Sequence, residues 1–369
     1  MYDTEERRLA HLTTRFEESR HALGRSKTDA RVQAERLIKR DQEGKRDNED
    51  RSKDEFGQSV RKAFPLADFF LDVGCDSGGQ TKRLIELLFG HPHMSPSRAE
   101  YAMFMARAVA LRSADMSRQI GAVIVDDDGE VLAAGCNEVP KPGGGVYWAG
   151  DETDHRDFQK GSDPNALLSH KVLVEMFEEL RHRGWLSAEL AGREAAALAE
   201  NAVADKVFDR ARITNLIEFG RVVHAEMNAL AYAARRGVAI GGRRLFCTTF
   251  PCHICARHII GAGIAEVVYI EPYPKSLTPD LYAEAIQLDP RAGQPDEGKV
   301  RFRAFIGVAP RRYMDVFRHG RRKNKLGYAL KWDPKSARPT AGPVGNPHLL
   351  AEADLCYKLD GVLLPENEN

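Results

Sequence analysis

The chain has 369 residues, 43% of them hydrophobic, and its 54 lysines and arginines are balanced by 54 aspartates and glutamates. This length gives room for two or three domains with a full core, and the lack of net charge argues against a global electrostatic attraction to nucleic acid. No stretch approaches the roughly 20 apolar residues of a membrane span, and the first residues are charged rather than signal-like. We therefore expect a cytoplasmic protein that does not cross a membrane.

The first predicted unit is an N-terminal helical region with a linker, residues 1–92. Residues 1–62 are dense in charge and poor in aromatic side chains, with helical stretches such as residues 28–43. This pattern is typical of a solvated helical face or arm. Residues 72–80 contain three glycines and are predicted to be a linker.

Residues 93–310 have the pattern of an α/β domain. A helix is expected first, with Ser95 as its cap, Pro96 in its first turn and an apolar face over residues 101–115. Two apolar strands then flank Asp128-Gly129, which is a hairpin signal. Further strands are expected at residues 243–250, 265–272 and 300–308, and an amphipathic helix at residues 277–288. Five strands interleaved with helices predict a three-layer α/β/α sandwich around a five-stranded mixed sheet.

An insertion at about residues 138–222 interrupts this domain and is too long for a plain loop. It opens with three consecutive glycines and continues into two predicted helices, residues 165–183 and 187–208. One interpretation is an accessory helical subdomain or a dimer contact. The other is a lid, since glycines let backbone close over a ligand, with Lys141 as a candidate phosphate contact.

The third predicted unit is a basic C-terminal tail, residues 311–369. Residues 311–325 carry seven basic residues and one acid. A charge run of this kind is most often a solvated face. A phosphate-facing strip and an RNA-binding element are the alternatives, and the run is too short to decide between them.

One motif carries more chemical information than any other part of the chain. His224-Ala225-Glu226 is followed, after a gap of 24 residues, by Pro251-Cys252 and then Cys255. An imidazole and two thiolates supply three ligands to a tetrahedral zinc ion and leave the fourth position open for water, as in catalytic sites. Glu226 lies two residues beyond a ligand, close enough to exchange protons with that water. This H-x-E…P-C-x-x-C spacing is typical of zinc nucleobase deaminases.

The competing interpretations of this motif are a redox pair or half of a structural zinc site. The chain has no second C-x-x-C, and a redox dithiol needs no H-A-E upstream, so we favour the catalytic site. The remaining four cysteines show no paired spacing and are expected to be free thiols: Cys75, Cys136, Cys247 and Cys356.

The residues around the motif resemble a known family. H-A-E-M-N-A-L at residues 224–230, with T-T-F-P-C-H-I-C-A at residues 248–256, is similar to deoxycytidylate (dCMP) deaminases of the cytidine deaminase superfamily. S-R-Q-I-G-A at residues 117–122 is similar to that family's S-Q-V-G-A segment. Gly135, Asn137 and Pro140 fall where the family has G-Y-N-G-x-P, while Cys136 and Glu138 depart from it. The resemblance covers about residues 96–308.

The resemblance implies a cytidine-deaminase-like fold and a hydrolase that converts dCMP, dCTP or both into the uracil nucleotide and ammonia. It implies one catalytic Zn²⁺ per chain on His224, Cys252 and Cys255, with Glu226 as the proton carrier, and a homo-oligomeric assembly. The implied substrate contacts are Asn137 for the sugar and base, Gln119 near the hairpin, Tyr273 stacking on the pyrimidine, and Arg118 as a phosphate partner, with Lys275 as a further candidate.

A narrower resemblance concerns the N-terminal region. Residues 1–73 and 83–104 are similar to the junction in two-domain antiphage dCTP deaminases, which carry a P-loop kinase-like domain ahead of the deaminase. The chain has no G-x-x-x-x-G-K-[ST], and residues 24–28 are only a fragment of one. We therefore expect a truncated kinase-like remnant that binds no nucleotide. The resemblance also implies an enzyme used in antiviral defence and regulation by an RNA or protein partner.

Three other functions compete with this prediction. A housekeeping dCMP deaminase of pyrimidine salvage would have the same chemistry. A polynucleotide deaminase is disfavoured because tRNA adenosine deaminases typically read E-P-C where this chain has Phe250-Pro251-Cys252, and because the overall charge is balanced. A catalytically silent nucleotide sensor is disfavoured by the intact Glu226, which a purely structural zinc site does not need.

Overall fold

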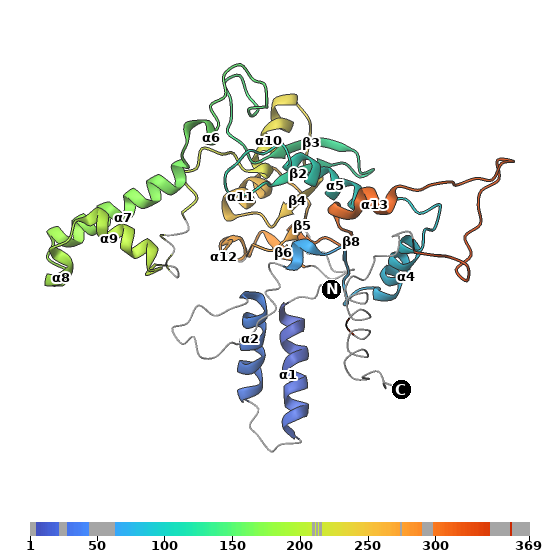
Figure 1. Cartoon of the computed structure of the whole chain (residues 1–369), viewed down its shortest axis with the longest axis horizontal. Coiled ribbons are helices and arrows are strands. Elements are labelled where there is room, and N and C mark those ends of the chain that lie inside the picture. The colour runs from blue at the N-terminus through green and yellow to red at the C-terminus, as the bar shows by residue number, and fades with distance from the viewer. Residues whose placement is uncertain are drawn as a thin grey trace, which may run out of the picture.

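A six-stranded mixed sheet organises the chain (Figure 1). The computed structural model describes residues 5–21, 28–43, 63–208, 211, 213, 216–273, 275–289, 298–339 and 355. The strand order is β3-β2-β4-β5-β7-β6. The strands are β2 (Gly121–Val125), β3 (Val131–Cys136), β4 (Arg244–Thr249), β5 (Glu266–Glu271), β6 (Ile286–Leu288) and β7 (Val300–Ala304).

The sheet is antiparallel at one edge and parallel through the rest. β2 runs antiparallel to β3 and β4, whereas β4, β5, β7 and β6 pair in parallel. The predicted hairpin is confirmed: Gly129 has φ +90° in the turn between β2 and β3, a backbone conformation that glycine adopts without strain. Parallel strands need crossover connections, and helix α11 (His253–Gly261) provides the one between β4 and β5.

Helices cover both faces of the sheet, so the predicted three-layer α/β/α architecture is confirmed. Ala122 and Ile124 of β2 pack with helix α10 (Ala225–Arg236) and helix α11 (His253–Gly261). Their neighbours Val123 and Val125 pack on the other face, with α5 (Arg98–Ala110). β2 is buried along its whole length because both of its faces are covered.

The structure corrects the strand count and one helix. Residues 277–288 do not form a single helix: α12 (Thr278–Leu281) ends early, and Ile286–Leu288 becomes β6, the sixth strand. β6 pairs in parallel with β7 and buries Ile286 to 4% exposure. The apolar residues of this stretch are too few to separate a short edge strand from a helical turn by periodicity alone.

Two helix starts also differ from prediction. Helix α5 is capped by Ser97, not Ser95, because Ser97 and Glu100 form a reciprocal capping box. The expected linker at residues 72–80 ends sooner, since Asp76 caps α4 (Ser77–Leu88) by accepting a hydrogen bond from the Gly79 N–H. A short second sheet pairs β1 (Phe69–Phe70) with β8 (Gly307–Val308), and a 3-10 turn, η1 (Phe64–Leu66), precedes it.

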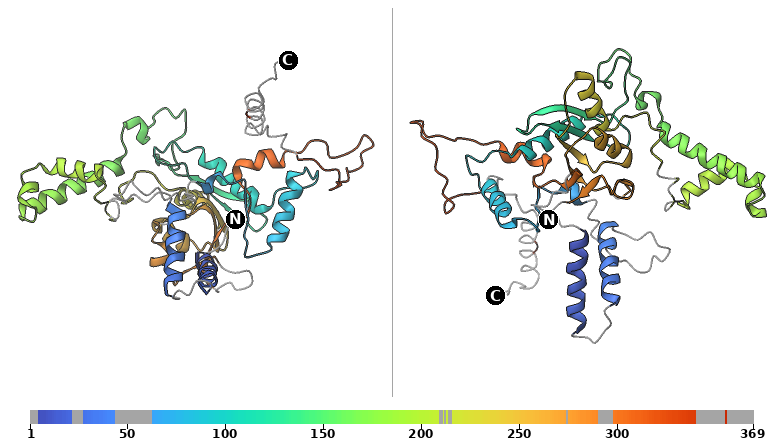
Figure 2. Two further views of the ribbon diagram at one scale, coloured as in Figure 1. Left: turned by 60° about the horizontal axis from the view of Figure 1, so that its bottom comes forward. Right: turned by 180° about the vertical axis from the view of Figure 1, so that it is seen from behind.

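Helical appendages project from this core (Figures 1 and 2). At the N-terminus, α1 (Glu5–His21) packs on α2 (Thr28–Glu43). The insertion, drawn in green, contains α6 (Asp157–Lys160) and α7 (Pro164–His182), which packs on α9 (Ala195–Ala204). The single helix expected at residues 187–208 is divided at Gly192, which caps the short α8 (Ala188–Ala191).

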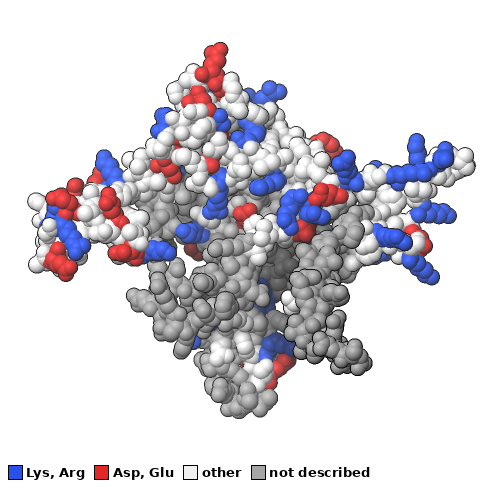
Figure 3. All heavy atoms as spheres, in the orientation of Figure 1, with Lys and Arg blue, Asp and Glu red and all other residues white. Residues whose placement is uncertain are grey.

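The described part of the basic tail forms an extended arm. After the 3-10 turn η3 (Pro310–Arg312) and α13 (Tyr313–Phe317), residues 318–339 contain no helix or strand. Lysine and arginine side chains gather over this arm (Figure 3). Among the described helices of the whole chain, none combines the length and apolar character that crossing a membrane requires.

Candidate active site

Two helix N-termini bring the motif residues together. His224 is the N-cap of α10, and Cys252 is the N-cap of α11, with Cys255 in the first turn of that helix. The small residues that follow His224 let α10 pack closely on the sheet, and Gly237 in the left-handed conformation ends it. β4 ends at Thr249, so the chain turns through Pro251 directly into α11.

The geometry of these three side chains fits a zinc ion. His224 Nδ1 lies 3.3 Å from Cys252 Sγ and 3.3 Å from Cys255 Sγ. In a tetrahedral site with ordinary Zn–N and Zn–S bonds, such atoms are about 3.5 Å apart. The three ligand atoms all lie within 4.8 Å of one another, and no other such group of His, Cys, Asp or Glu occurs among the described residues.

The site also has the electrostatics of a metal centre. Hydrogen bonds from Cys255 and then from His224 lower the pKa of Cys252 to about 4. The hydrogen bond to Cys252 raises the pKa of His224 to about 9. Cys255 donates to the Cys252 thiolate, and this bond together with burial raises its pKa well above the usual value. A thiolate is therefore present before any metal binds, and a metal has to displace only the other protons.

Glu226 lies in the first turn of α10, beside the ligands and not among them. Its side chain is 5% exposed and lines the same pocket as His224 and Cys252. Burial, and then the charge of Cys252, raise the pKa of its carboxyl. A carboxyl in this environment holds a proton more readily than one in water, as a group that accepts and returns a proton must.

The pocket above the ligands is walled by three parts of the chain. One wall is the loop between α5 and β2, the second comes from the insertion, and the third follows β4 and β5. The lining residues are Asp115, Met116, Ser117, Arg118, Ile120, Asn137, Asp157, Asp163, Asn165, Ile217, Gly220, Val222, His224, Glu226, Thr249, Phe250, Cys252 and Tyr273.

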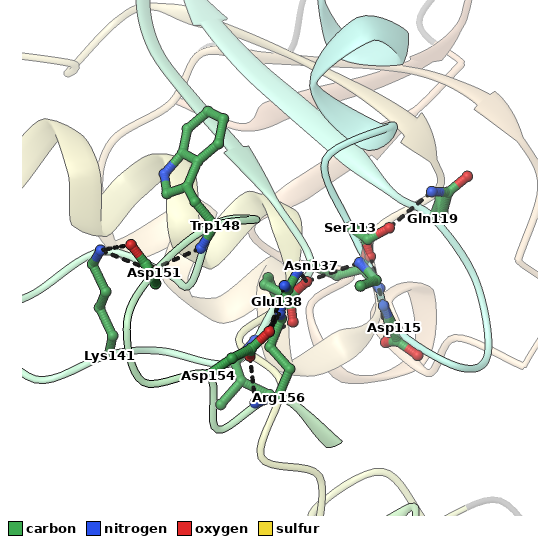
Figure 4. Close-up of polar contacts among 12 residues, drawn as sticks. Ser113, Asp115, Gln119, Asn137, Glu138, Lys141, Trp148, Asp151, Asp154 and Arg156 are labelled. Atoms are coloured by element: carbon green, nitrogen blue, oxygen red, sulfur yellow. Dashed lines mark hydrogen bonds and ion pairs between the residues drawn. The ribbon is translucent and has the colours of Figure 1, made fainter. Parts of the chain in front are cut away.

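Three of the four predicted substrate contacts line this pocket. Asn137 borders it, although its side chain is only 3% exposed. Tyr273 and Arg118 stand on the same side, with the Arg118 guanidinium carbon 5.7 Å from the centre of the Tyr273 ring. Gln119 does not line the pocket; its amide donates to the carbonyl of Ser113 at 2.8 Å (Figure 4).

The two lysine candidates are not among the lining residues. Lys141 forms an ion pair with Asp151 at 3.0 Å, within the first loop of the insertion (Figure 4). Lys275 follows Tyr273 by two positions and also lies outside the lining. Among the described residues that line the pocket, Arg118 is the only lysine or arginine.

Apart from Glu226 and Asn137, sequence reasoning missed the pocket's acidic and amide residues. Asp115 stands just before the S-R-Q-I-G-A segment, and this position is the only feature of the sequence that could have indicated that Asp115 belongs to the site. Asp157, Asp163 and Asn165 belong to the insertion and reach the pocket through contacts distant in sequence. Asn165 Nδ2 donates to the Leu216 carbonyl at 2.8 Å, while its buried Oδ1 has no hydrogen-bond partner among the described residues.

Parts of the chain are similar to known proteins. Residues 96–271 match the family model of the cytidine and deoxycytidylate deaminase zinc-binding region. The deoxycytidylate deaminase of Enterobacteria phage T2 is 44% identical over 54 residues, which cover 15% of this chain and 29% of that protein. The probable deoxycytidylate deaminase of Drosophila melanogaster is 28% identical over 171 residues, which cover 46% of this chain and 58% of that protein.

Among solved structures, the chain is similar to dCMP deaminase from the cyanophage S-TIM5 in complex with dCMP and dUMP. The identity is 21% and the TM-score 0.31, over 57% of this chain and 99% of that one. The chain spans less than two thirds of the length of the curated relatives it matches.

Proposed function

We infer that this chain, whose residues 96–271 belong to the cytidine and deoxycytidylate deaminase zinc-binding family, catalyses the zinc-dependent hydrolytic deamination of a deoxycytidine nucleotide. The observation that carries the inference is the convergence of three candidate zinc ligands, with the buried Glu226, whose pKa is raised, lining the same pocket as His224 and Cys252. The products are the corresponding deoxyuridine nucleotide and ammonia.

His224, Cys252 and Cys255 are the residues that would hold the metal. A zinc ion bound there supplies a water that is nucleophilic at neutral pH. Glu226 accepts a proton from the attacking water and delivers it to ring N3, while the water oxygen forms a bond to C4. Glu226 then transfers the remaining proton of that oxygen to the exocyclic amine, the C4–N bond breaks as the C4 carbonyl forms, and ammonia leaves.

The nucleotide would lie along the pocket away from the metal. Tyr273 presents an aromatic ring for stacking on the pyrimidine, and Arg118 offers a guanidinium to a phosphate. Asn137 and Gln119 belong to the surrounding loop network, and Gln119 supports that loop through Ser113.

We extend the proposal to dCTP as a substrate and to antiphage defence by depletion of deoxycytidine nucleotides. Support for this extension is the resemblance of residues 59–73 and 83–104 to two-domain antiphage dCTP deaminases. The alternative is a housekeeping dCMP deaminase of pyrimidine salvage, which the names of the relatives from phage T2 and Drosophila favour. We also propose a homo-oligomer, which light scattering can test.

The deciding experiment offers dCMP, dCTP, CMP, CTP and deoxycytidine side by side to the zinc-loaded protein and measures ammonia release. The Glu226→Ala variant is the blank. Removing the proton carrier should lower the turnover rate roughly 100-fold or more, while zinc stays bound. Turnover of dCTP supports the antiphage extension, and turnover of dCMP alone supports salvage. Turnover by Glu226→Ala at the wild-type rate would refute the role of Glu226.

A further inference from the structure

The balanced charge of the whole chain conceals an uneven distribution. Residues 318–339, which we name the basic arm, carry eight lysines and arginines and one acid, Asp333. Because the whole chain has as many acids as lysines and arginines, the residues outside the basic arm hold an excess of seven acids. All eight cations are exposed, and none forms an ion pair with a residue that the structure describes. They are Arg318, Arg321, Arg322, Lys323, Lys325, Lys331, Lys335 and Arg338. The basic arm is therefore a concentrated positive surface.

The tip of the basic arm is a short hairpin shaped by its own hydrogen bonds. Lys323 and Ala329 form an antiparallel bridge, and the Asn324 side chain closes the turn between them. Asn324 Oδ1 accepts from the N–H groups of Leu326 and Tyr328, both at 2.9 Å. These two side chains extend into solvent, at 82% and 69% exposure. The tip therefore presents an aliphatic side chain and an aromatic ring among the cations.

The base of the basic arm is held against the domain on both sides. On the outgoing side, His319 Nε2 lies 2.6 Å from the Met94 carbonyl oxygen. On the returning side, Trp332 Nε1 donates to the Phe89 carbonyl at 3.2 Å, and the centre of the Trp332 ring lies 5.0 Å from that of His91. The arm then projects away from the sheet (Figures 1 and 2), and its cations gather over this projection (Figure 3). The positive surface is thus presented from a fixed base.

A linear polyanion matches the form of this surface. In extended backbone, successive residues advance by about 3.3 Å, so the cations are spread along a line rather than gathered in one small pocket. Proteins bind single-stranded nucleic acid with cations that follow the phosphate backbone and with aromatic side chains on which bases stack. The basic arm has the cations, and Tyr328 supplies the aromatic ring.

An anionic membrane surface fits the basic arm less well. Interfacial binding by a protein segment rests on a broad apolar face, usually one side of an amphipathic helix. Residues 318–339 contain no helix, and of their large apolar side chains only Leu326 and Tyr328 are exposed. Two side chains do not make such a face.

We propose that the basic arm binds single-stranded polynucleotide, with its lysines and arginines on the phosphates and Tyr328 stacked on a base. Phosphate contacts and stacking are available from every nucleotide, so this binding tolerates different sequences. The basic arm contributes no residue to the pocket that Glu226 lines. The polynucleotide site therefore does not depend on the proposed function.

Fluorescence anisotropy tests the proposal with the full zinc-loaded chain and short labelled single strands of RNA and DNA of the same mixed sequence. A quadruple variant replaces the cations nearest the tip by glutamine: Arg321→Gln, Arg322→Gln, Lys323→Gln and Lys325→Gln. We expect its affinity to fall roughly tenfold or more. Each phosphate contact contributes about 0.7 to the slope of log affinity against log salt for a single strand, so this slope should decrease by roughly 3.

RNA and DNA strands are compared side by side because phosphate contacts and stacking are common to both. Binding of either strand supports the proposal, and the tighter of the two identifies the class of the partner. A wild-type chain that binds neither strand would overturn the proposal, and so would a quadruple variant with the affinity and salt slope of the wild type.

The matched control removes the same charge from another projecting part of the chain. Four exposed cations of the insertion are replaced by glutamine: Lys160→Gln, Lys171→Gln, Arg183→Gln and Arg193→Gln. Three of them form exposed ion pairs within α7 and α8, which contribute little to stability. This control should bind the strands as the wild type does. An equal loss of affinity would show that net charge explains the binding and would overturn the proposal.

Tyr328 distinguishes a single strand from other polyanions. Tyr328→Ala should weaken single-strand binding roughly tenfold, whereas Tyr328→Phe keeps the ring and should bind as the wild type does. A duplex of the same sequence should bind more weakly than a single strand, because its bases are already stacked on one another. Tighter binding of the duplex, or wild-type affinity in Tyr328→Ala, would overturn the assignment to a single strand. Binding to phosphatidylserine vesicles without binding to either strand would assign the arm to a membrane instead.

Zinc content and turnover separate the basic arm from the proposed function. The quadruple variant should keep one zinc per chain and the wild-type turnover of the preferred free nucleotide, because none of its four positions lines the pocket. If the wild-type protein deaminates none of the offered nucleotides while strand binding follows the expected pattern, the proposed function fails and the polynucleotide site stands. If turnover is normal and no strand binds, the opposite holds.

Discussion

Three protonatable side chains meet at the metal site, and each holds its proton differently. At pH 7, Cys252 with a pKa of about 4 is a thiolate, whereas His224 with a pKa of about 9 is protonated. Cys255 keeps its proton because its pKa is raised well above the usual value. Zinc requires a neutral imidazole and two thiolates. The metal therefore has to remove protons from His224 and Cys255 but none from Cys252.

This distribution predicts the number of protons that zinc releases. Binding of zinc to the stripped protein at pH 7 should release about two protons, so the affinity should rise about 100-fold per pH unit near neutrality and fall as the solution becomes acidic. Calorimetric titration in buffers of different ionisation enthalpy measures the released protons directly. Release of three protons would contradict this distribution, because it would require Cys252 to be protonated in the stripped protein together with His224 and Cys255.

Two cysteine substitutions accompany this titration: one tests the ligand set and the other is a control. Cys252→Ala removes one of the three ligands and should leave the purified protein with far less than one zinc per chain by elemental analysis. Cys75→Ala changes an exposed free cysteine outside the site and should titrate like the wild type. A stoichiometric zinc content in Cys252→Ala would show that the ligand set is a different one.

At the scale of elements, the packing of β3 on α10 determines where His224 lies. Gly135 of β3 faces the backbone of α10, and a Cβ at this position would overlap backbone atoms of Ala225 and Ala229. Backbone cannot rotate away as a side chain can. We expect Gly135→Ala to destabilise the protein by about 1–3 kcal/mol and to weaken zinc binding, because α10 carries His224 at its N-cap.

Chemical denaturation and zinc content check this prediction together. Gly78→Ala is the control, since a Cβ there meets nothing within 4 Å and the residue lies in the first turn of α4. That change should be neutral or stabilise by about 0.4–1 kcal/mol, by restricting the unfolded chain. Equal stability of the two variants would show that β3 and α10 separate at little cost.

The elements around the site could be predicted from sequence because their signals are local. The small residues after His224 and the proline before Cys252 mark both helix starts within a few positions. Residues 277–288 could not be assigned correctly, because the strand at their end depends on pairing with β7, whose sequence follows later in the chain. Ser97, in contrast, could have been assigned as the cap from a local signal, because Glu100 stands three residues after it and completes a capping box that Ser95 lacks.

At the scale of the whole molecule, the sequence shows the ligands but not the pocket. Asp115 and the insertion residues reach it through the folded arrangement of segments that are distant in sequence, so no spacing identifies them. The same limit applies to Gln119, which lies outside the pocket lining: a motif position can indicate importance, but which hydrogen bonds a side chain makes is decided by its neighbours in space, here the Ser113 carbonyl.

The insertion is the feature of the whole molecule whose role can be tested most directly. Arg221, near its C-terminal end, pairs with Asp157 at 2.6 Å and donates to the His155 carbonyl at 3.0 Å, so the chain before α7 lies beside the chain that leads to α10. A short glycine-serine linker in place of residues 159–218 can therefore close the chain without moving the zinc ligands. We expect this variant to retain one zinc per chain, because β4, α10 and α11 are untouched.

Substrate binding should nevertheless weaken, because the excision removes Asp163 and Asn165 from the pocket wall. If the insertion acts as a wall or lid, KM should rise at least tenfold, and Asn165→Ala in the full chain should reproduce part of that rise, since it deletes the buried Oδ1 that has no described partner. If the insertion is an accessory subdomain or a dimer contact, KM should stay at the wild-type value in both variants. Loss of a dimer contact would then appear in light scattering of the excised variant as fewer chains per particle.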